Sequence, residues 1–258
     1  YLEIPNPCEN PDLTVSSFQC CNKMFNIKNK NLKKLMFEEE MILKACCIHM
    51  NRKTPSFFEA CRLLGNIGEF NQSISDKLDY DFFTELISDI LQDEEENDDI
   101  VASTIMVCNT LATNDSIRNI LIEEKSIFEG ILNTSYRSFE VKKCSIKLLT
   151  SLFENDSIYL LQNLIDHGTL DFFVNFLEAE DDIFVYESLL SLIDLIKHFV
   201  TKQADSDMPP PFVEVLKNSQ ELIECLEKLS FDEDVIEKVH EASTYAYHLC
   251  LESLGIEY

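Results

Sequence analysis

The chain has 258 residues and a formal net charge of −26, from 21 Lys and Arg against 47 Asp and Glu. This surplus excludes nonspecific nucleic-acid binding, because phosphate contacts need a basic surface. A hydrophobic share of 45% excludes a wholly disordered acidic chain, which lacks the apolar surface that offsets the entropy of ordering. No apolar run approaches the ~20 residues that cross a bilayer. We therefore expect a folded acidic protein that favours basic partners and does not bind membranes.

The ten cysteines are spread through helical patterning and include two adjacent pairs, Cys20-Cys21 and Cys46-Cys47. No signal peptide precedes them, so we expect reduced thiols in an intracellular protein. Cys46, Cys47 and His49 lack the paired spacing of a zinc site, and we interpret the two thiols as buried. The chain opens at Tyr1 rather than Met, which leaves open that it is a fragment of a longer protein.

Helical patterning begins over residues 13–27. This segment resembles the third helix of a three-helix repeat, with no first and second helix before it. Helices are then predicted over 32–37, 41–50 and 55–70, with Thr54 as a cap and Pro55 at the first helical position.

A short motif marks a repeat. Asn-Gln-Ser-Ile at 71–74 returns as Asn-Asp-Ser-Ile at 114–117 and 155–158, at spacings of 43 and 41 residues. A period in the low forties with internal helices is typical of armadillo or HEAT units, each of which buries its apolar face against a neighbour. We interpret these Asn-x-Ser copies as helix boundaries rather than glycosylation sites.

Aligning the copies superposes the helices that precede them on one buried stripe, with apolar or small residues at i, i+3 and i+7. The stripe is predicted to contain Phe57, Ala60, Leu64 and Gly68, then Ile100, Ser103, Val107 and Leu111, then Val141, Cys144, Leu148 and Leu152.

Two shorter helices follow the third copy, over 157–166 and 169–177. Acidic loops at 93–99 and 178–182 supply carboxylates that cap the long helices after them. A loop over 202–211 contains three consecutive prolines and interrupts the period. A last pair of helices, 219–230 and 232–253, closes the stack as a polar cap.

These elements predict an all-α fold, an armadillo-repeat right-handed superhelical solenoid. We expect one array over 1–258, with a partial repeat 1–28, repeats near 29–70, 71–113, 114–154 and 155–201, and a terminal helical cap near 212–258.

The string Cys-Arg-Leu-Leu-Gly-Asn-Ile-Gly at 61–68 resembles the third-helix segment of the importin-α family, in which Leu-Gly-Asn-Ile is typical. Residues 164–170 resemble the join between that family's first and second helices, and residues 226–238 resemble its last repeat. The resemblance covers most of the chain.

The resemblance implies a nuclear-import adaptor of the cytoplasm and nucleus, without a cofactor. Its partners would be basic nuclear localisation signals, bound in an acidic groove on the concave third-helix face, and transport receptors. In the family, an Asn on each third helix hydrogen-bonds the ligand backbone, and a Trp one turn earlier stacks on lysine and arginine stems.

At the family's Asn positions this chain has Asn66, Asn109 and Thr150, with Asp194 in a less certain alignment. Arg62, Ile105, Ile146 and Leu190 stand at the Trp positions, and the chain contains no tryptophan. Asn66 and Asn109 each lie two positions beyond a stripe residue, about 200 degrees around the helix from Leu64 and Val107. Glu59 and Arg62 share the outward face of Asn66. The candidate peptide-binding residues are therefore Asn66, Asn109, Thr150, Glu59, Arg62, Ile105 and Ile146. The alternative for Asn66 and Asn109 is a solvated or helix-capping role without ligand binding.

Several functions stay open. Within the resemblance, the chain is a divergent carboxy-terminal part of an import adaptor, an adaptor that recognises its ligand by charge, or an adaptor with another cargo. Outside it, the chain is an armadillo or HEAT scaffold that binds folded partners in a larger complex. We predict no enzyme: Gly65-x-x-Gly68 lies inside a helix and lacks the lysine and the strand of a phosphate loop.

Overall fold

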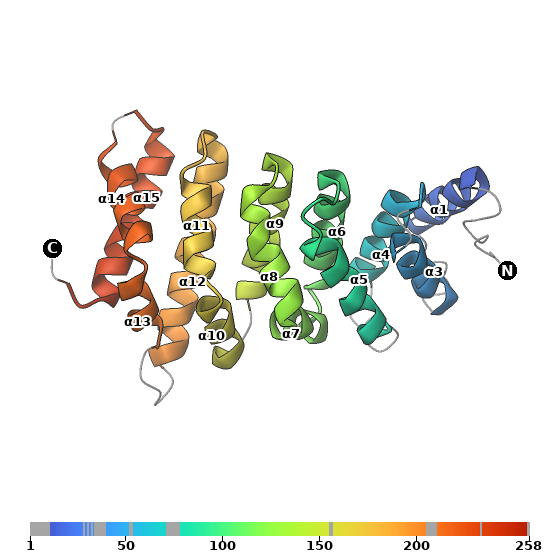
Figure 1. Cartoon of the computed structure of the whole chain (residues 1–258), viewed down its shortest axis with the longest axis horizontal. Coiled ribbons are helices and arrows are strands. Elements are labelled where there is room, and N and C mark those ends of the chain that lie inside the picture. The colour runs from blue at the N-terminus through green and yellow to red at the C-terminus, as the bar shows by residue number, and fades with distance from the viewer. Residues whose placement is uncertain are drawn as a thin grey trace. The chain divides into compact units, whose positions relative to one another are not determined.

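A computed structural model describes residues 11–27, 29, 31, 33, 40–51, 54–70, 78–154, 157–204, 211–232 and 234–256. Every regular element in these ranges is a helix, which confirms the predicted all-α class (Figure 1). Most of the predicted helix over 32–37, the first Asn-x-Ser copy at 71–74 and most of the loop over 202–211 lie outside the described residues. The chain divides into two compact units, residues 1–130 and 131–258. The predicted repeat boundaries and the single array stay predictions.

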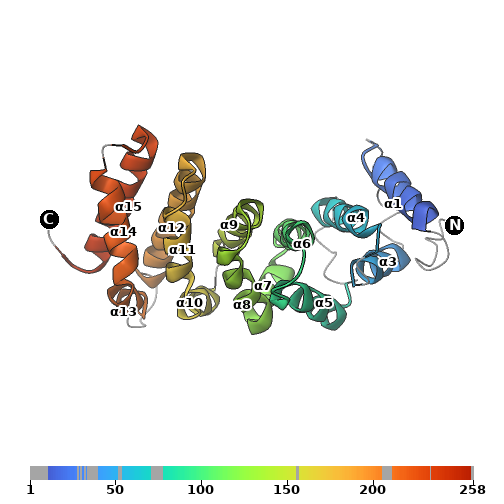
Figure 2. The same cartoon turned by 45° about the horizontal axis from the view of Figure 1, so that its top comes forward.

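The first unit holds two layers of helices. One layer consists of the helices that the sequence predicted as third helices, with α1 packed on α4 and α4 on α6. The other layer contains α3, which packs on α4 and α5, and α5, which packs on α6. Figure 2 shows these two rows in this unit. The helices are α1 (Pro11–Phe25), α3 (Glu40–Asn51), α4 (Phe57–Phe70), α5 (Tyr80–Gln92), α6 (Asp98–Leu111), α7 (Asp115–Glu123) and α8 (Lys125–Asn133).

In the second unit, helices also pack on equivalent helices, and here the contacts involve first, second and third helices of the repeats. The long helix α12 packs between α9 and α15, α11 packs on α12 and α14, and α10 packs on α13. Third helices therefore contact third helices, second contact second and first contact first, which is the pattern of stacked three-helix repeats. The elements are the 3₁₀ turn η2 (Thr134–Tyr136), α9 (Phe139–Phe153), α10 (Ile158–Asp166), α11 (Thr169–Leu177), α12 (Asp182–Ala204), α13 (Pro211–Asn218), α14 (Gln220–Phe231) and α15 (Glu237–Ser253).

Polar side chains begin several of these helices where the sequence predicted boundaries. Asn114 caps α7 and Ser157 caps α10, each side chain accepting a hydrogen bond from the backbone amide three residues on. Asp181 does the same before α12, at 2.8 Å. Before α6 the cap is Asn97 and not one of the neighbouring carboxylates. These bonds satisfy amides that have no partner inside the helix.

Three predicted helix starts are wrong by two residues or more. Helix α1 begins at Pro11 rather than 13. Helix α4 begins at Phe57 rather than 55, because the hydroxyl groups of Thr54 and Ser56 bond each other at 2.8 Å and both lie against the buried ring of His49. Helix α15 begins at Glu237 rather than 232, after a turn in which the Asp232 carboxylate accepts the Asp234 amide.

The buried stripe is also shifted from the predicted one. The buried positions of α4 return on α6 at a spacing of 44 residues, so that Cys61 matches Ile105. The predicted spacing of 43 placed Ile100 and Ser103 in the stripe, but both are half-buried, whereas Val101 and Thr104 are fully buried. The reason is that the link from helix to Asn-x-Ser motif is one residue shorter in the second copy. The spacing is 41 from α6 to α9 and 43 from α9 to α12.

Candidate functional site

A groove runs between α4 and α6 in the first unit. The corrected spacing of 44 pairs Arg62 with Met106 and Asn66 with Thr110, and all four side chains line the groove, which has a volume of about 410 Å³. The outward row of each third helix therefore meets the same row of the next one. The remaining lining residues are Phe58, Cys61, Gly65, Ser103 and Val107.

Large apolar side chains stand open to solvent at this groove. Phe58 is 49% exposed and Met106 is 59% exposed, and the exposed Arg62 lies one helical turn from Phe58. Aromatic residues, methionine and arginine are the residue types enriched in the cores of protein interfaces. The chemistry of this groove suits contact with side chains of another protein.

Asn66 is held in place inside the first unit. Its side-chain amide donates to the Asn22 side-chain oxygen at 3.1 Å. The Asn22 amide in turn donates to the Glu59 backbone carbonyl at 3.1 Å and to the Glu59 carboxylate at 2.8 Å. Asn22 is buried on α1. This network joins α1 to α4. The main role of Glu59 and Asn66 in this structure is therefore to hold the two helices together.

Two of the predicted ligand-binding residues are wrong. Ile105 is 0% exposed and Ile146 is 3% exposed, so neither side chain can contact a ligand at the surface. The shorter link described above moved the helical register by one residue. The exposed positions equivalent to Arg62 are Met106, Lys147 and Leu190. A peptide-binding role for the other candidates stays a prediction.

The same register separates the two asparagines. Asn66 corresponds to Thr110, whereas Asn109 corresponds to Gly65 and to Thr150. Asn109 is half-buried and does not line the groove between α4 and α6. The predicted ladder of equivalent asparagines is therefore absent from these two helices.

A second groove lies between α9 and α12 in the second unit, with a volume of about 470 Å³. Thr150 lines it, and its hydroxyl donates to the Ile146 carbonyl at 2.9 Å and lies 2.6 Å from the Ser191 hydroxyl. Asp194 and His198 face the groove from consecutive turns of α12, together with Phe153, Glu154, Lys197 and Thr201. Glu154 and Asp194 supply two carboxylates and Lys197 an ammonium group, so the groove is polar but not uniformly acidic.

Buried thiols and a buried histidine pack the first unit. Burial raises the pKa of Cys47 and of Cys108 to about 12, so both stay neutral thiols near pH 7. His49 is buried, and its ring makes a T-shaped contact with the Phe18 ring at a centroid distance of 4.9 Å. Within the described ranges, no three His, Cys, Asp or Glu side chains are placed to hold a metal ion. Among those same residues, no helix is both long and apolar enough to span a bilayer.

Comparison with solved structures decides the fold. Two designed armadillo repeat proteins match with TM-scores of 0.72 and 0.68, at 16% and 15% identity, over 95% and 94% of this chain and 95% of each of theirs. The chain has the armadillo-repeat fold. The first of these structures contains a bound peptide, (KR)4. An engineered protein also matches, with a TM-score of 0.72 and 13% identity, over 97% of this chain and 95% of that one. No protein-family model and no curated protein matches the chain.

Sequence reasoning missed Phe58 and Met106. An alignment of burial patterns rather than of the Asn-x-Ser motif places Met106 opposite Arg62, and the spacing of 44 is visible in the run Leu63-Leu64 against Val107-Cys108. The motif lies beyond the helix end, where loop length varies, and it is the helix itself that carries the packing register.

Proposed function

We propose that this chain is a protein-binding repeat scaffold and that the groove between α4 and α6 is its principal contact surface. The observation that carries the proposal is the exposure of Phe58 and Met106 beside Arg62 on facing helices. Apolar and arginine anchors of this kind supply most of the binding energy in protein interfaces. The proposal assigns no enzymatic activity to the chain.

The partner in this proposal is a folded protein rather than an extended peptide. Capture of an extended backbone needs a ladder of side-chain amides that are available to the ligand. Asn66 already donates to Asn22, and the Thr150 hydroxyl already bonds Ser191. A partner that inserts side chains between the helices does not need these groups.

The test replaces the two anchors together, as Phe58→Ser plus Met106→Ser. Because each side chain is only about half exposed and Phe58 also packs on the Phe57 ring, we expect the free energy of unfolding to fall by about 1–3 kcal/mol, and circular dichroism verifies that the variant folds. Partner binding should fall by at least about tenfold, since each anchor of this kind is worth about 1 kcal/mol or more. Unchanged binding by the folded variant would refute the proposed surface.

A second candidate is the adaptor reading, in which the chain binds extended basic segments for nuclear import between cytoplasm and nucleus. Two observations favour it: the net charge of −26 and a structural neighbour whose bound peptide is (KR)4. Attraction of this kind weakens as salt rises, because the Debye length is only about 10 Å at 0.1 M.

The two candidates separate in one titration. A labelled bipartite basic peptide is titrated at two salt concentrations into the wild type and into Asn66→Ala plus Asn109→Ala. The adaptor reading requires weaker binding by the double variant. Equal affinity, or no peptide binding at either salt concentration, together with retained binding of a folded partner, favours the scaffold.

A further inference from the structure

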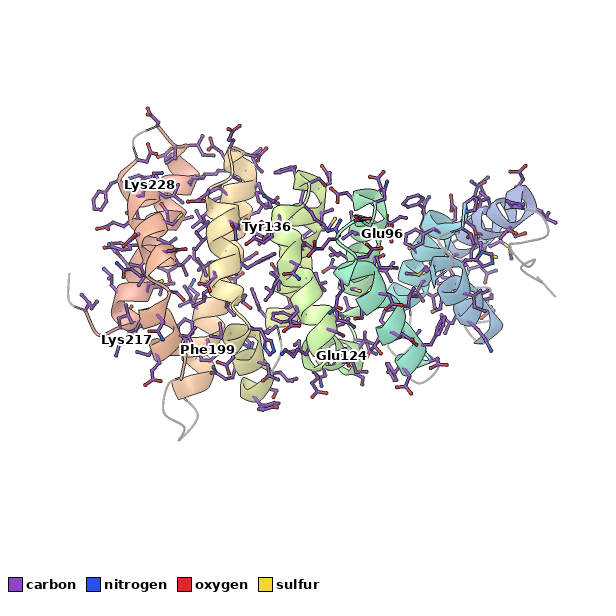
Figure 3. All side chains as sticks on the ribbon, in the orientation of Figure 1. Glu96, Glu124, Tyr136, Phe199, Lys217 and Lys228 are labelled. Atoms are coloured by element: carbon purple, nitrogen blue, oxygen red, sulfur yellow. The ribbon has the colours of Figure 1, made fainter. Side chains whose placement is uncertain are left out.

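A third groove, with a volume of about 670 Å³, lies between the second-helix elements α11 and α14. The two helices pack as neighbours in the second unit (Figures 1 and 2). The α14 wall is a single helical face, because its lining residues recur at i, i+3, i+4, i+7, i+8 and i+11. These residues are Glu221, Glu224, Cys225, Lys228, Leu229 and Asp232, and Figure 3 labels Lys228 on this wall.

The floor of this α11–α14 groove is apolar. Leu177 is buried, and Val174, Cys225 and Leu229 are half-buried, so they present hydrocarbon and a thiol to the space between the helices. Ala179 and Val235 continue the apolar lining. Such a floor can accept aliphatic side chains, with a gain of about 25 cal/mol for each Å² of apolar surface removed from water.

The rim of the groove is acidic. Three exposed carboxylates line it: Glu178 at the end of α11, and Glu221 and Glu224 on α14. Asp232 lies at the end of α14. Among the described lining residues, these four carboxylates stand against one cation, Lys228. The groove therefore combines an apolar floor with a net negative rim.

Charged groups on both walls act on Cys225 in the floor of the groove. The pKa of the Cys225 thiol is raised to about 11, first by burial and then by the Glu178 carboxylate, while Lys228 opposes the shift. Glu178 belongs to the end of α11 and Lys228 to the last turn of α14. A ligand seated over Cys225 would therefore meet charged groups from both helices.

We propose that the α11–α14 groove binds a partner segment in which lysine or arginine alternates with aliphatic side chains. The aliphatic groups lie on Leu177, Cys225 and Leu229, and the cations meet the carboxylates of the rim. An acidic ligand is disfavoured, because like charges brought together at an interface are destabilising. The groove volume falls within the range of pockets that take ligands of a few side chains.

This inference rests on the proposed function in one respect only, that the chain binds proteins. The surface is a different one: it is built from second helices, whereas Phe58 and Met106 stand on third helices of the other unit. The two ideas can therefore fail separately.

The experiment uses a fluorescein-labelled heptapeptide of alternating lysine and leucine, titrated into the whole chain and followed by fluorescence anisotropy. The test variant is Glu221→Gln plus Glu224→Gln, which keeps side-chain shape and removes two charges from the rim. The matched control is Glu123→Gln plus Glu140→Gln, which removes two exposed charges outside the groove. Circular dichroism verifies that both variants fold.

We expect Glu221→Gln plus Glu224→Gln to bind the peptide about tenfold more weakly, because it loses two exposed ion pairs with the peptide and each contributes modestly. The control variant should bind within about twofold of the wild type. Raising NaCl from about 0.05 to 0.5 M should weaken the wild type more than the groove variant. Equal affinity of the two variants, or equal binding of a glutamate–leucine peptide, overturns the inference. Loss of partner binding by Phe58→Ser plus Met106→Ser, with the heptapeptide unaffected by the rim charges, leaves the proposed function standing and this inference refuted.

Discussion

Two glycines of the first unit, substituted by alanine, should change stability in opposite directions. A Cβ at Gly130 on α8 would lie 2.6 Å from the Cβ of Leu91 on α5 and 3.4 Å from the Leu91 backbone carbon. Carbon atoms in contact prefer about 3.5–4.0 Å, and neither opposing atom is the free end of a side chain, so the helices must separate. A Cβ at Gly65 on α4 would lie 3.8 Å from the Thr110 hydroxyl, which is an ordinary contact.

The magnitudes follow from two terms. Alanine in place of glycine inside a helix gains about 0.5–1 kcal/mol at both positions. Overpacking at Gly130 costs about 1–3 kcal/mol against that gain. Gly65→Ala should therefore raise the free energy of unfolding by about 0.5–1 kcal/mol, and Gly130→Ala should lie about 1–3 kcal/mol below Gly65→Ala.

Urea unfolding followed by circular dichroism at 222 nm measures both variants. Both glycines lie in the same compact unit, so the same transition reports on both. An increase in stability for Gly130→Ala equal to that for Gly65→Ala would refute the close packing of α8 on α5.

The remaining predictions concern buried polar groups and thiols. The raised pKa of Cys108, about 12 against about 8.5 in an unfolded chain, means that the unfolded state releases its proton first as pH rises. Stability contributed by this thiol is complete below about pH 8.5 and falls above it, by up to about 1.4 kcal/mol per pH unit, and urea midpoints of wild type and Cys108→Ala between pH 8 and 10 under reducing conditions test the slope. Asn22→Ala removes the acceptor of Asn66 and the donor to Glu59, and we expect a loss of about 1–3 kcal/mol in chemical denaturation. Asn66→Ala should cost less, about 0.5–1.5 kcal/mol, because its side chain is only half-buried; a loss larger than that for Asn22→Ala would contradict the network.

Much of the fold could be read from periodicity. The predicted helix over 169–177 is α11 to the residue, and the helix predicted over 219–230 is α14 shifted by one. Apolar spacing identifies such elements because a helix must place one face against its neighbours. The repeat itself was evident from a motif that caps helices, at Asn114 and at Ser157.

The site could be predicted only in part, because a shift of one residue turns a helical position by about 100 degrees. The motif spacing predicts Ile105 and Ile146 on the outward face, but a difference of one residue in loop length places both in the core. Met106 was missed for the same reason. The α11–α14 groove had no sequence signal before the two helices were known to be neighbours.

The central claim, that Phe58 and Met106 anchor a protein partner, is tested most directly by quantitative affinity capture from cells that express the chain. Wild type is compared with Phe58→Ser plus Met106→Ser and with a control, Tyr159→Ser plus Ile183→Ser, which removes two large exposed side chains elsewhere, each 67% exposed. We predict that a specific partner is enriched by the wild type and the control and is not recovered with Phe58→Ser plus Met106→Ser. Equal recovery of that partner by all three proteins would contradict the account.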